Sequence, residues 1–358
     1  MAQAHTTSVQ LRLAFWNTWL LAPRVWPGGP HLPWSDRVFA PDVERRAELT
    51  GEALRDRFDV IALAEAFEDS EQAAVAARLG GMRLMAGPRR TRRRFTGSGL
   101  ATLVDERRLR VAGSSQLVYR SGGDLRDSDT FATKGALMVQ LDVVGDTPEG
   151  ATAATSATEI SASIDVVSTH LFAGGDLFPI PGANDTARHH RVRLGQLREL
   201  VEFIDEHRRD DAALVLAGDF NVSAHDRDPR LGDPTERYVD MCKILEPLGV
   251  SDLWANAGVG PGHTCTFDHP SDLPPDPEDR DRVLDLDDDR SPTAGERIDY
   301  LWFAPPGSAR PGSARPSAVI TAERPRRWAF GGRDARGGPA GSLSDHLCLS
   351  VTLDIRPR

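Results

Sequence analysis

Short apolar runs, many rich in Val, Ile and Leu, recur along nearly the whole chain. Runs of this length and composition are typical of strands buried in a sheet. The predicted strands are Leu11–Trp16, Asp59–Ala64, Arg83–Ala86, Gly99–Val104, Gln116–Tyr119, Ala136–Val144, Ile164–Thr169, Ala213–Ala217, Ile298–Phe303, Ala318–Ala322 and Leu347–Leu353.

Other segments space their apolar residues three and four positions apart, which predicts helices. These are residues 42–57, 70–79, 186–207 and 235–247. The third is the clearest, because Leu197, Val201 and Ile204 share one face, and Asn184 or Asp185 could cap its start. Since strands outnumber helices, the pattern favours a two-sheet α/β sandwich flanked by helices.

Composition fits one large soluble enzyme. Of the 358 residues, 40% are hydrophobic and 27% charged, which are ordinary values for a chain with a sizeable core. A single domain over residues 9–356 is expected because the polar motifs described below come from both ends of the chain. The net charge of -10 argues against a globally basic nucleic-acid binder.

Three segments are predicted to be surface-loop insertions. Residues 145–163 are rich in Ala, Thr and Ser, residues 268–296 are rich in Asp and Pro, and residues 305–316 contain a repeated PGSAR motif. The three cysteines, Cys242, Cys265 and Cys348, cannot all pair and have no zinc-ligand spacing. With no export signal or membrane-length apolar run in the sequence, we expect a cytoplasmic protein. No segment points to a protein partner.

Polar residues stand at the ends of the apolar runs in a regular way. They are Asn17 in FWNTW, Glu65 in VIALAEAFE, His170 in VVSTHLF, Asp219 and Asn221 in LVLAGDFNV, Asp299 in RIDYLWF, and Asp345 with His346 in LSDHLCLSVTL. Strand ends hold such side chains rigidly while leaving their tips open to a cleft. Carboxylates, amides and imidazoles in this combination suit a hard divalent cation and attack on a phosphate ester.

These motifs, in this order, resemble the endonuclease/exonuclease/phosphatase superfamily, with the resemblance spanning residues 11–354. It implies a four-layer α/β/β/α sandwich, similar to that of DNase I. In that family the residues matching Glu65 and Asp345 bind a metal, with Asn17 beside them. Mg²⁺ is the expected cofactor, with Mn²⁺ or another divalent cation as the alternative.

The resemblance also implies the catalytic roles. Asp299 would orient His346, whose other ring nitrogen activates water or assists the leaving group. Asp345 is a poor partner for this, since adjacent side chains on a strand diverge. Asp219 and Asn221, on one face of a strand, would orient the water and bind the transition state. His170 would donate to a nonbridging phosphoryl oxygen.

The substrate features point in two directions. The Lys134-Gly135 step and the Arg-x-x-Gln helix after the STH motif resemble the sphingomyelinase-like branch, although Leu171 and Phe172 replace a polar residue usual there. They favour a phospholipid-type phosphodiester. The arginine run 89–94 instead suits nucleic-acid phosphates or anionic headgroups, which keeps a metal-dependent nuclease as the alternative. A binding module without activity is a third, weaker hypothesis, because the full set of motifs is present.

Overall fold

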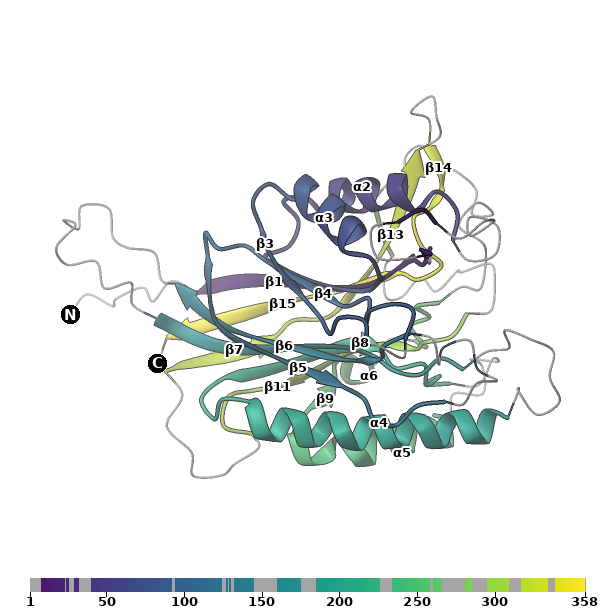
Figure 1. Ribbon diagram of the computed structural model, residues 1–358. Helices are drawn as coiled ribbons and strands as arrows, with labels where there is room; N and C mark the ends of the chain where they lie inside the picture. Colours follow the sequence, from purple (N-terminus) through teal and green to yellow (C-terminus); the bar gives the residue numbers. More distant parts are fainter. Residues whose placement is uncertain are drawn as a thin grey trace, which may run out of the picture.

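Two β-sheets packed face to face, with helices on their outer faces, make up the fold (Figure 1). The computed structural model describes residues 8–22, 24–25, 29–31, 40–91, 94–123, 127, 129, 132–144, 160–174, 185–225, 234–257, 260–265, 281–284, 295–308, 317–333 and 339–357. Helices α2 (Val43–Leu54) and α3 (Asp69–Arg78) cover one sheet, whereas α4 (Thr186–His207) and α5 (Glu236–Leu245) cover the other. This arrangement confirms the predicted four-layer sandwich.

The first sheet joins the two ends of the chain. Its central order is β10-β13-β15-β1-β2-β4-β3, with β12 paired to β15 and β14 to β13. The strands are β1 (Val9–Leu20), β2 (Val60–Ala66), β3 (Arg83–Ala86), β4 (Ala101–Val104), β10 (Asp281–Leu284), β12 (Ala318–Ala322), β13 (Arg326–Arg333), β14 (Pro339–Ser342) and β15 (Cys348–Pro357). Since β1 pairs antiparallel with β15 and parallel with β2, segments from both termini lie side by side.

The second sheet has the order β5-β6-β7-β8-β11-β9. Its strands are β5 (Leu109–Val118), β6 (Gly135–Val144), β7 (Ile160–His170), β8 (Ala213–Asp219), β9 (Ser251–Asp252) and β11 (Asp299–Ala304). Strands β7 and β8 run parallel, whereas β8 and β11 run antiparallel.

The core between the sheets is built by inward-facing aliphatic and aromatic side chains. Leu13 and Phe15 of the first sheet share this cluster with Val139 and Val215 of the second, and all four are buried. Each fully buried aliphatic or aromatic side chain of this size stabilises the fold by about 1.5–3 kcal/mol. Two further clusters bind the helices to the outer faces. The sheets are therefore fixed against each other, and so are the polar residues at their ends.

Helix α4 begins as its sequence predicts. The side chain of Asp185 accepts a hydrogen bond from the backbone nitrogen of Arg188 at 3.0 Å, which satisfies one of the free N–H groups of the first turn. Thr235 caps α5 in the same way through Tyr238. Helix α2 is shorter than predicted: Asp42 before it has a left-handed backbone, and Arg55 after it is extended.

Several predicted boundaries are wrong. Residues 160–163, expected in a loop, begin β7, and residues 281–284, expected in another, form β10. Strand β5 starts at Leu109, seven residues before the prediction. Strands β9, β13 and β14, with the short helix α6 (Leu253–Ala257), have no predicted counterpart. The remaining parts of the predicted insertions at 145–159 and 309–316, and most of 268–296, lie outside the described residues.

Candidate active site

Strand register in the second sheet places three of the candidate residues in one row. Asp219 at the end of β8 is the register partner of His170 in β7 and of Asp299 in β11. His170 is in turn the partner of Gly135 in β6. Adjacent strands lie about 4.8 Å apart, so these residues form a compact polar edge.

Asn17 and Glu65 reach the same edge from the first sheet. Nδ2 of Asn17 donates to Oε1 of Glu65 at 3.1 Å and to Oδ2 of Asp219 at 3.0 Å. Glu65 has a left-handed backbone (φ 59°), and Gly99 packs against it so tightly that an added Cβ would lie 3.0 Å from the Cα of Glu65. The contact between Asn17 and Asp219 therefore joins the two sheets within the site.

Asn17 is oriented by its own backbone turn. Its Oδ1 accepts a hydrogen bond from the backbone nitrogen of Trp19 at 3.1 Å, so the amide nitrogen faces the carboxylates. The amide would have to rotate for its oxygen to bind a cation. In this conformation Asn17 holds Glu65 and Asp219 in place.

His346 and Asp299 form the closest polar pair of the site. Nδ1 of His346 lies 2.8 Å from Oδ2 of Asp299. The backbone nitrogen of Asp299 donates to the hydroxyl oxygen of Thr264 at 3.1 Å, and Nε1 of Trp16 donates to the carbonyl of His346 at 2.9 Å. The contact that the resemblance implies is thus present, and it leaves Nε2 facing Asp219 at 3.9 Å.

The pKa values of His346 and Asp219 are both raised above their usual values by their surroundings. Burial alone would lower the pKa of His346, but the charges of Asp299 and Cys265 raise it well above the usual value. Burial and the charge of Asp299 together raise the pKa of Asp219 to about 7, against the opposing charge of His346. Without a cation, His346 therefore carries a proton near neutral pH, and Asp219 can exchange one.

The position of Asn221 differs from the one predicted from the sequence. It lies beyond the end of β8 with a left-handed backbone (φ 51°), so strand alternation does not place it beside Asp219. Its side-chain nitrogen donates to the carbonyl of Leu171 at 3.2 Å, and its backbone nitrogen donates to Oδ1 of Asp219 at 2.9 Å. In this conformation Asn221 holds Asp219 and the segment after His170.

The side chain of Lys134 holds His170 in place, and the sequence motifs do not predict this contact. Nζ of Lys134 lies 2.9 Å from Nε2 of His170 and 3.0 Å from Oδ1 of Asp129. Burial lowers the pKa of His170 well below its usual value, and the charges of Lys134 and His346 act in the same direction. His170 is therefore a neutral imidazole beside a buried cation.

The acidic groups of the site suit a divalent cation. Burial raises the pKa of Glu65, and the charge of Asp345 raises it further. A bound cation would relieve both effects. Among the described residues, three sets of potential ligands have metal spacing: Glu65, His170 and Asp219; Asp219, Asp299 and His346; and Cys265, Asp345 and His346. None of them contains both Glu65 and Asp345, so a shared ion would use water ligands, as Mg²⁺ commonly does.

Arg46 is a supporting residue without a motif of its own. From α2 it donates to the carbonyls of Thr18 at 3.0 Å and Trp19 at 3.1 Å, and it also contacts the carbonyl of Leu343 at 3.0 Å. It thereby ties the segment after Asn17 to the segment before Asp345. Burial lowers its pKa to about 10, against the charges of Asp345 and Glu65. Its helical position gave no signal in the sequence.

A pocket of about 380 Å³ has Lys134, the neighbour of His170, in its wall. Its walls include Lys134, Asp129, Arg94, Gln196, Phe172 and Val118. Gln196 is held in place by accepting the backbone N–H of Phe172 at 2.8 Å. The pocket thus combines cationic and apolar walls next to the row of candidate catalytic residues.

The sequence matches the Endonuclease/Exonuclease/phosphatase family over residues 14–346, which is nearly the whole chain. The chain belongs to this family. Membership supports phosphoester hydrolysis as the general class of reaction. No curated protein matched the sequence.

Solved structures of similar fold have low sequence identity. Sphingomyelinase C from Streptomyces griseocarneus is 18% identical, with a TM-score of 0.55 and coverage of 96% of this chain and 99% of that one. A mutant beta toxin from Staphylococcus aureus, with bound magnesium ions, is 15% identical (TM-score 0.53; coverage 98% and 100%). D. rerio TDP2, complexed with a single strand DNA product, is also 15% identical (TM-score 0.54; coverage 96% and 98%). At these identities they show the family fold.

The relatives with bound magnesium and with DNA show that the fold can hold a divalent cation and a nucleic-acid product in other proteins. In the described part of this family member, no helix is both long and apolar enough to cross a membrane.

Proposed function

We propose that this protein is a divalent-metal-dependent phosphodiesterase that acts on a phospholipid-type substrate. The proposal of phosphoester hydrolysis rests on one arrangement of side chains at the junction of the two sheets. There the pair of His346 and Asp299 faces Asp219, with Glu65 and Asn17 beside it. Glu65 and Asp345, with Asn17 beside them, would hold Mg²⁺. Bound there, the cation would neutralise charge on the phosphoryl group.

The proton chemistry divides between two residues. Asp219, with its pKa near neutral, is suited to orient the attacking water and take its proton. His346 carries a proton that Asp299 stabilises, so it is suited to protonate the leaving oxygen. Neutral His170 donates to a nonbridging oxygen, and Lys134 behind it adds positive charge.

The preference for a phospholipid rests on the surroundings of the pocket. Phe95 is 62% exposed and follows Arg94, and Val118 in the pocket wall is 43% exposed. They are two of the four exposed large hydrophobic residues found in the described part of the chain. Apolar groups beside Arg94 and Lys134 suit a substrate that combines a phosphate with an acyl chain. The sphingomyelinase relative supports the same class.

A nuclease is the second candidate, because Arg89 and Arg90 are exposed at the start of the arginine run. Residues 92 and 93 of the run lie outside the described part. The DNA-bound TDP2 relative favours this candidate.

One purified sample distinguishes the two candidates. Wild-type protein with Mg²⁺ is offered sphingomyelin in mixed micelles and, separately, plasmid DNA, with Asp219→Asn as the control for contaminating enzymes. We expect phosphocholine release that the control lacks. Nicking of plasmid by the wild type alone, without phosphocholine release, would establish the nuclease instead.

A further inference from the structure

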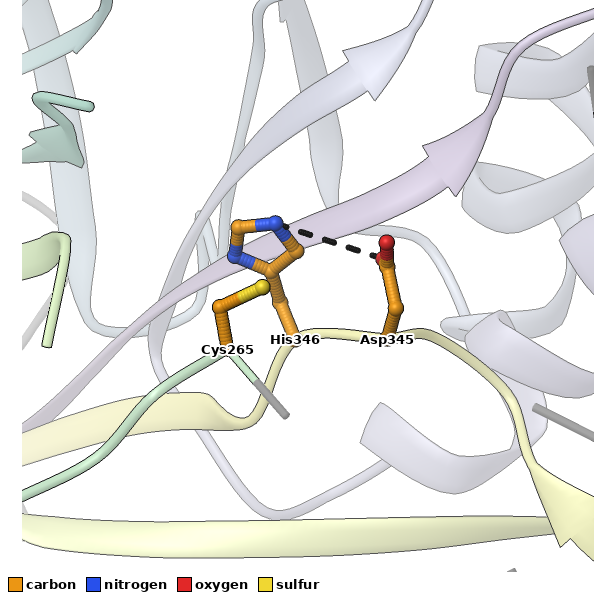
Figure 2. A group of neighbouring side chains, drawn as sticks. All are labelled: Cys265, Asp345 and His346. Atoms are coloured by element: carbon orange, nitrogen blue, oxygen red, sulfur yellow. Dashed lines mark ion pairs between the residues drawn. The ribbon is translucent and has the colours of Figure 1, made fainter. Parts of the chain in front are cut away.

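Cys265 lies against His346. Backbone bridges join Cys265 to both His346 and Glu296, and the cysteine is buried. Figure 2 shows its sulfur close to the imidazole ring, with the carboxylate of Asp345 reaching the same ring from the neighbouring position. Nε2 of His346 is 4.0 Å from Oδ1 of Asp345. The candidate catalytic histidine is thus flanked by a thiol and a carboxylate.

The ligand chemistry of this group differs from that of the proposed magnesium site. Cys265, Asp345 and His346 each offer one ligand atom, and the three atoms lie within 4.8 Å of one another. Thiolate and imidazole are ligands that Zn²⁺ and similar ions prefer, whereas Mg²⁺ prefers oxygen. Tetrahedral zinc ligands lie about 3.5 Å apart, so modest side-chain movement would close the group around such an ion.

The surroundings of His346 also match those of a metal-binding histidine. Such residues usually donate their other ring nitrogen to a carboxylate, which fixes the tautomer. Asp299 fills this position through Nδ1 at 2.8 Å. Oδ1 of Asp299 is buried and has no hydrogen-bond partner among the described residues, so a nearby cation would stabilise it. The side chain of Asp345, 27% exposed, provides a route from solvent.

We infer that Cys265, Asp345 and His346 form a binding site for zinc or a similar thiophilic cation, and that an ion held there inhibits the enzyme. The ion would occupy the imidazole of His346 and the carboxylate of Asp345, both of which the proposed hydrolysis requires. A fourth ligand would be water. The thiol sets this site apart from the oxygen site around Glu65.

Cadmium provides a test that does not depend on hydrolysis, because its bond to a thiolate gives an ultraviolet charge-transfer band. Metal-free protein is titrated with Cd²⁺. In the wild type, we expect the absorbance of this band to reach its maximum at one equivalent of Cd²⁺. We expect no band in Cys265→Ser and an unchanged band in the control Cys242→Ser, which replaces the half-buried cysteine on α5. A wild type without the band, or a band that survives Cys265→Ser, overturns the inference.

Two further variants separate this site from the proposed function. Glu65→Gln should keep the cadmium band even if it removes magnesium-dependent hydrolysis. Asp345→Asn should keep the band but weaken Cd²⁺ binding by about tenfold or more, and unchanged affinity would exclude Asp345 as a ligand. If Cys265→Ser does not fold, Asp345→Asn still tests whether the proposed ion binds at this site. Where hydrolysis is measurable, the Zn²⁺ concentration for half inhibition should rise about tenfold in Cys265→Ser, and an unchanged concentration would contradict inhibition through this site.

Discussion

The carboxylate of Glu65 is largely buried close to Asp345, and both effects raise its pKa, so a bound cation would stabilise its charged form. We predict that Glu65→Gln removes most activity and weakens Mg²⁺ binding by about tenfold or more, with the fold intact. Asn17 can still donate to the glutamine oxygen. Isothermal titration with Mg²⁺ measures the loss, and Glu236→Gln at the exposed start of α5 is the matched control. Unchanged magnesium affinity in Glu65→Gln would refute the assignment.

His346 and Asp299 should act as one unit, because a single hydrogen bond fixes both the ring and its proton. We predict that His346→Ala and Asp299→Ala each lower kcat by about two or more orders of magnitude, and that the double variant is little worse than the worse single one. Steady-state kinetics of the three variants test this. Losses that multiply in the double variant would show that the two residues work independently.

Residue type and order predict which side chains meet at the site, but not how they are turned. Asp299 and His346 pair as expected, since both lie at the start of apolar runs that the motifs identify. The amide of Asn17 faces the carboxylates because of the turn at Trp19, and Asn221 leaves the strand geometry through its left-handed backbone. The contact of Lys134 with His170 crosses between two strands and has no local signature. Backbone detail of this kind is not encoded in hydrophobic spacing.

At the level of elements, continuous apolar runs are predicted well and mixed ones poorly. Strands β2, β6 and β8 have nearly all residues buried, and their sequences are accordingly mostly apolar. Strand β13 is rich in Arg and Gly and gives no strand signal. Its buried Arg327 is accommodated by donating to the carbonyl of His263 and by lying 4.8 Å from the ring of Trp254. Tertiary contacts, not composition, make that segment a strand.

Helix α3 carries a capping glutamate that couples stability to pH. Glu71 accepts the backbone N–H of Glu68 at 3.1 Å, and burial, reinforced by the charge of Glu68, raises its pKa to about 8. From about pH 4.5 to 8 the folded state therefore holds a proton that the unfolded state has lost, so the contribution of Glu71 to stability falls as pH rises through this window.

We predict that Glu71→Gln removes this dependence, because the amide stays neutral and can still accept from Glu68. Relative to the wild type, the variant should gain more than about 1 kcal/mol of unfolding free energy between pH 5 and 8. Urea unfolding at several pH values measures the difference, with Glu236→Gln as the control at the exposed start of α5. A difference that does not change with pH would contradict the prediction.

The whole molecule brings together residues that the sequence separates by more than three hundred positions. Asn17 and His346 meet because β1 and β15 are adjacent strands, and Asp219 joins them because the second sheet packs across the first. The alternation of strands and helices, together with the family resemblance, predicts this layering. The loops around the site are less predictable, since their shape depends on contacts and not on periodicity. Exposed residues on these loops therefore test the choice between the phospholipid and nuclease proposals.

The exposed arginines offer the sharpest test of that choice. The net charge of -10 makes Arg89 and Arg90 a local exception on an acidic protein. If they bind nucleic acid, changing both to Ser should weaken DNA binding and flatten its salt dependence, because each phosphate contact releases counterions. Under the phospholipid proposal, we predict that this double variant cleaves a short soluble phosphocholine diester at the wild-type rate and that neither protein shows salt-dependent DNA binding.

Arg324→Ser combined with Arg326→Ser is the charge-matched control, because both arginines are exposed, Arg326 begins β13 of the first sheet, and Arg324 lies two positions before it. It separates a local effect of Arg89 and Arg90 from the effect of two lost positive charges anywhere on the surface. Fluorescence anisotropy with labelled single- and double-stranded DNA, at several salt concentrations, measures binding for all three proteins. Wild-type binding that falls steeply with salt, and that only the Arg89 and Arg90 variant loses, would overturn the preference for a phospholipid and favour the nuclease.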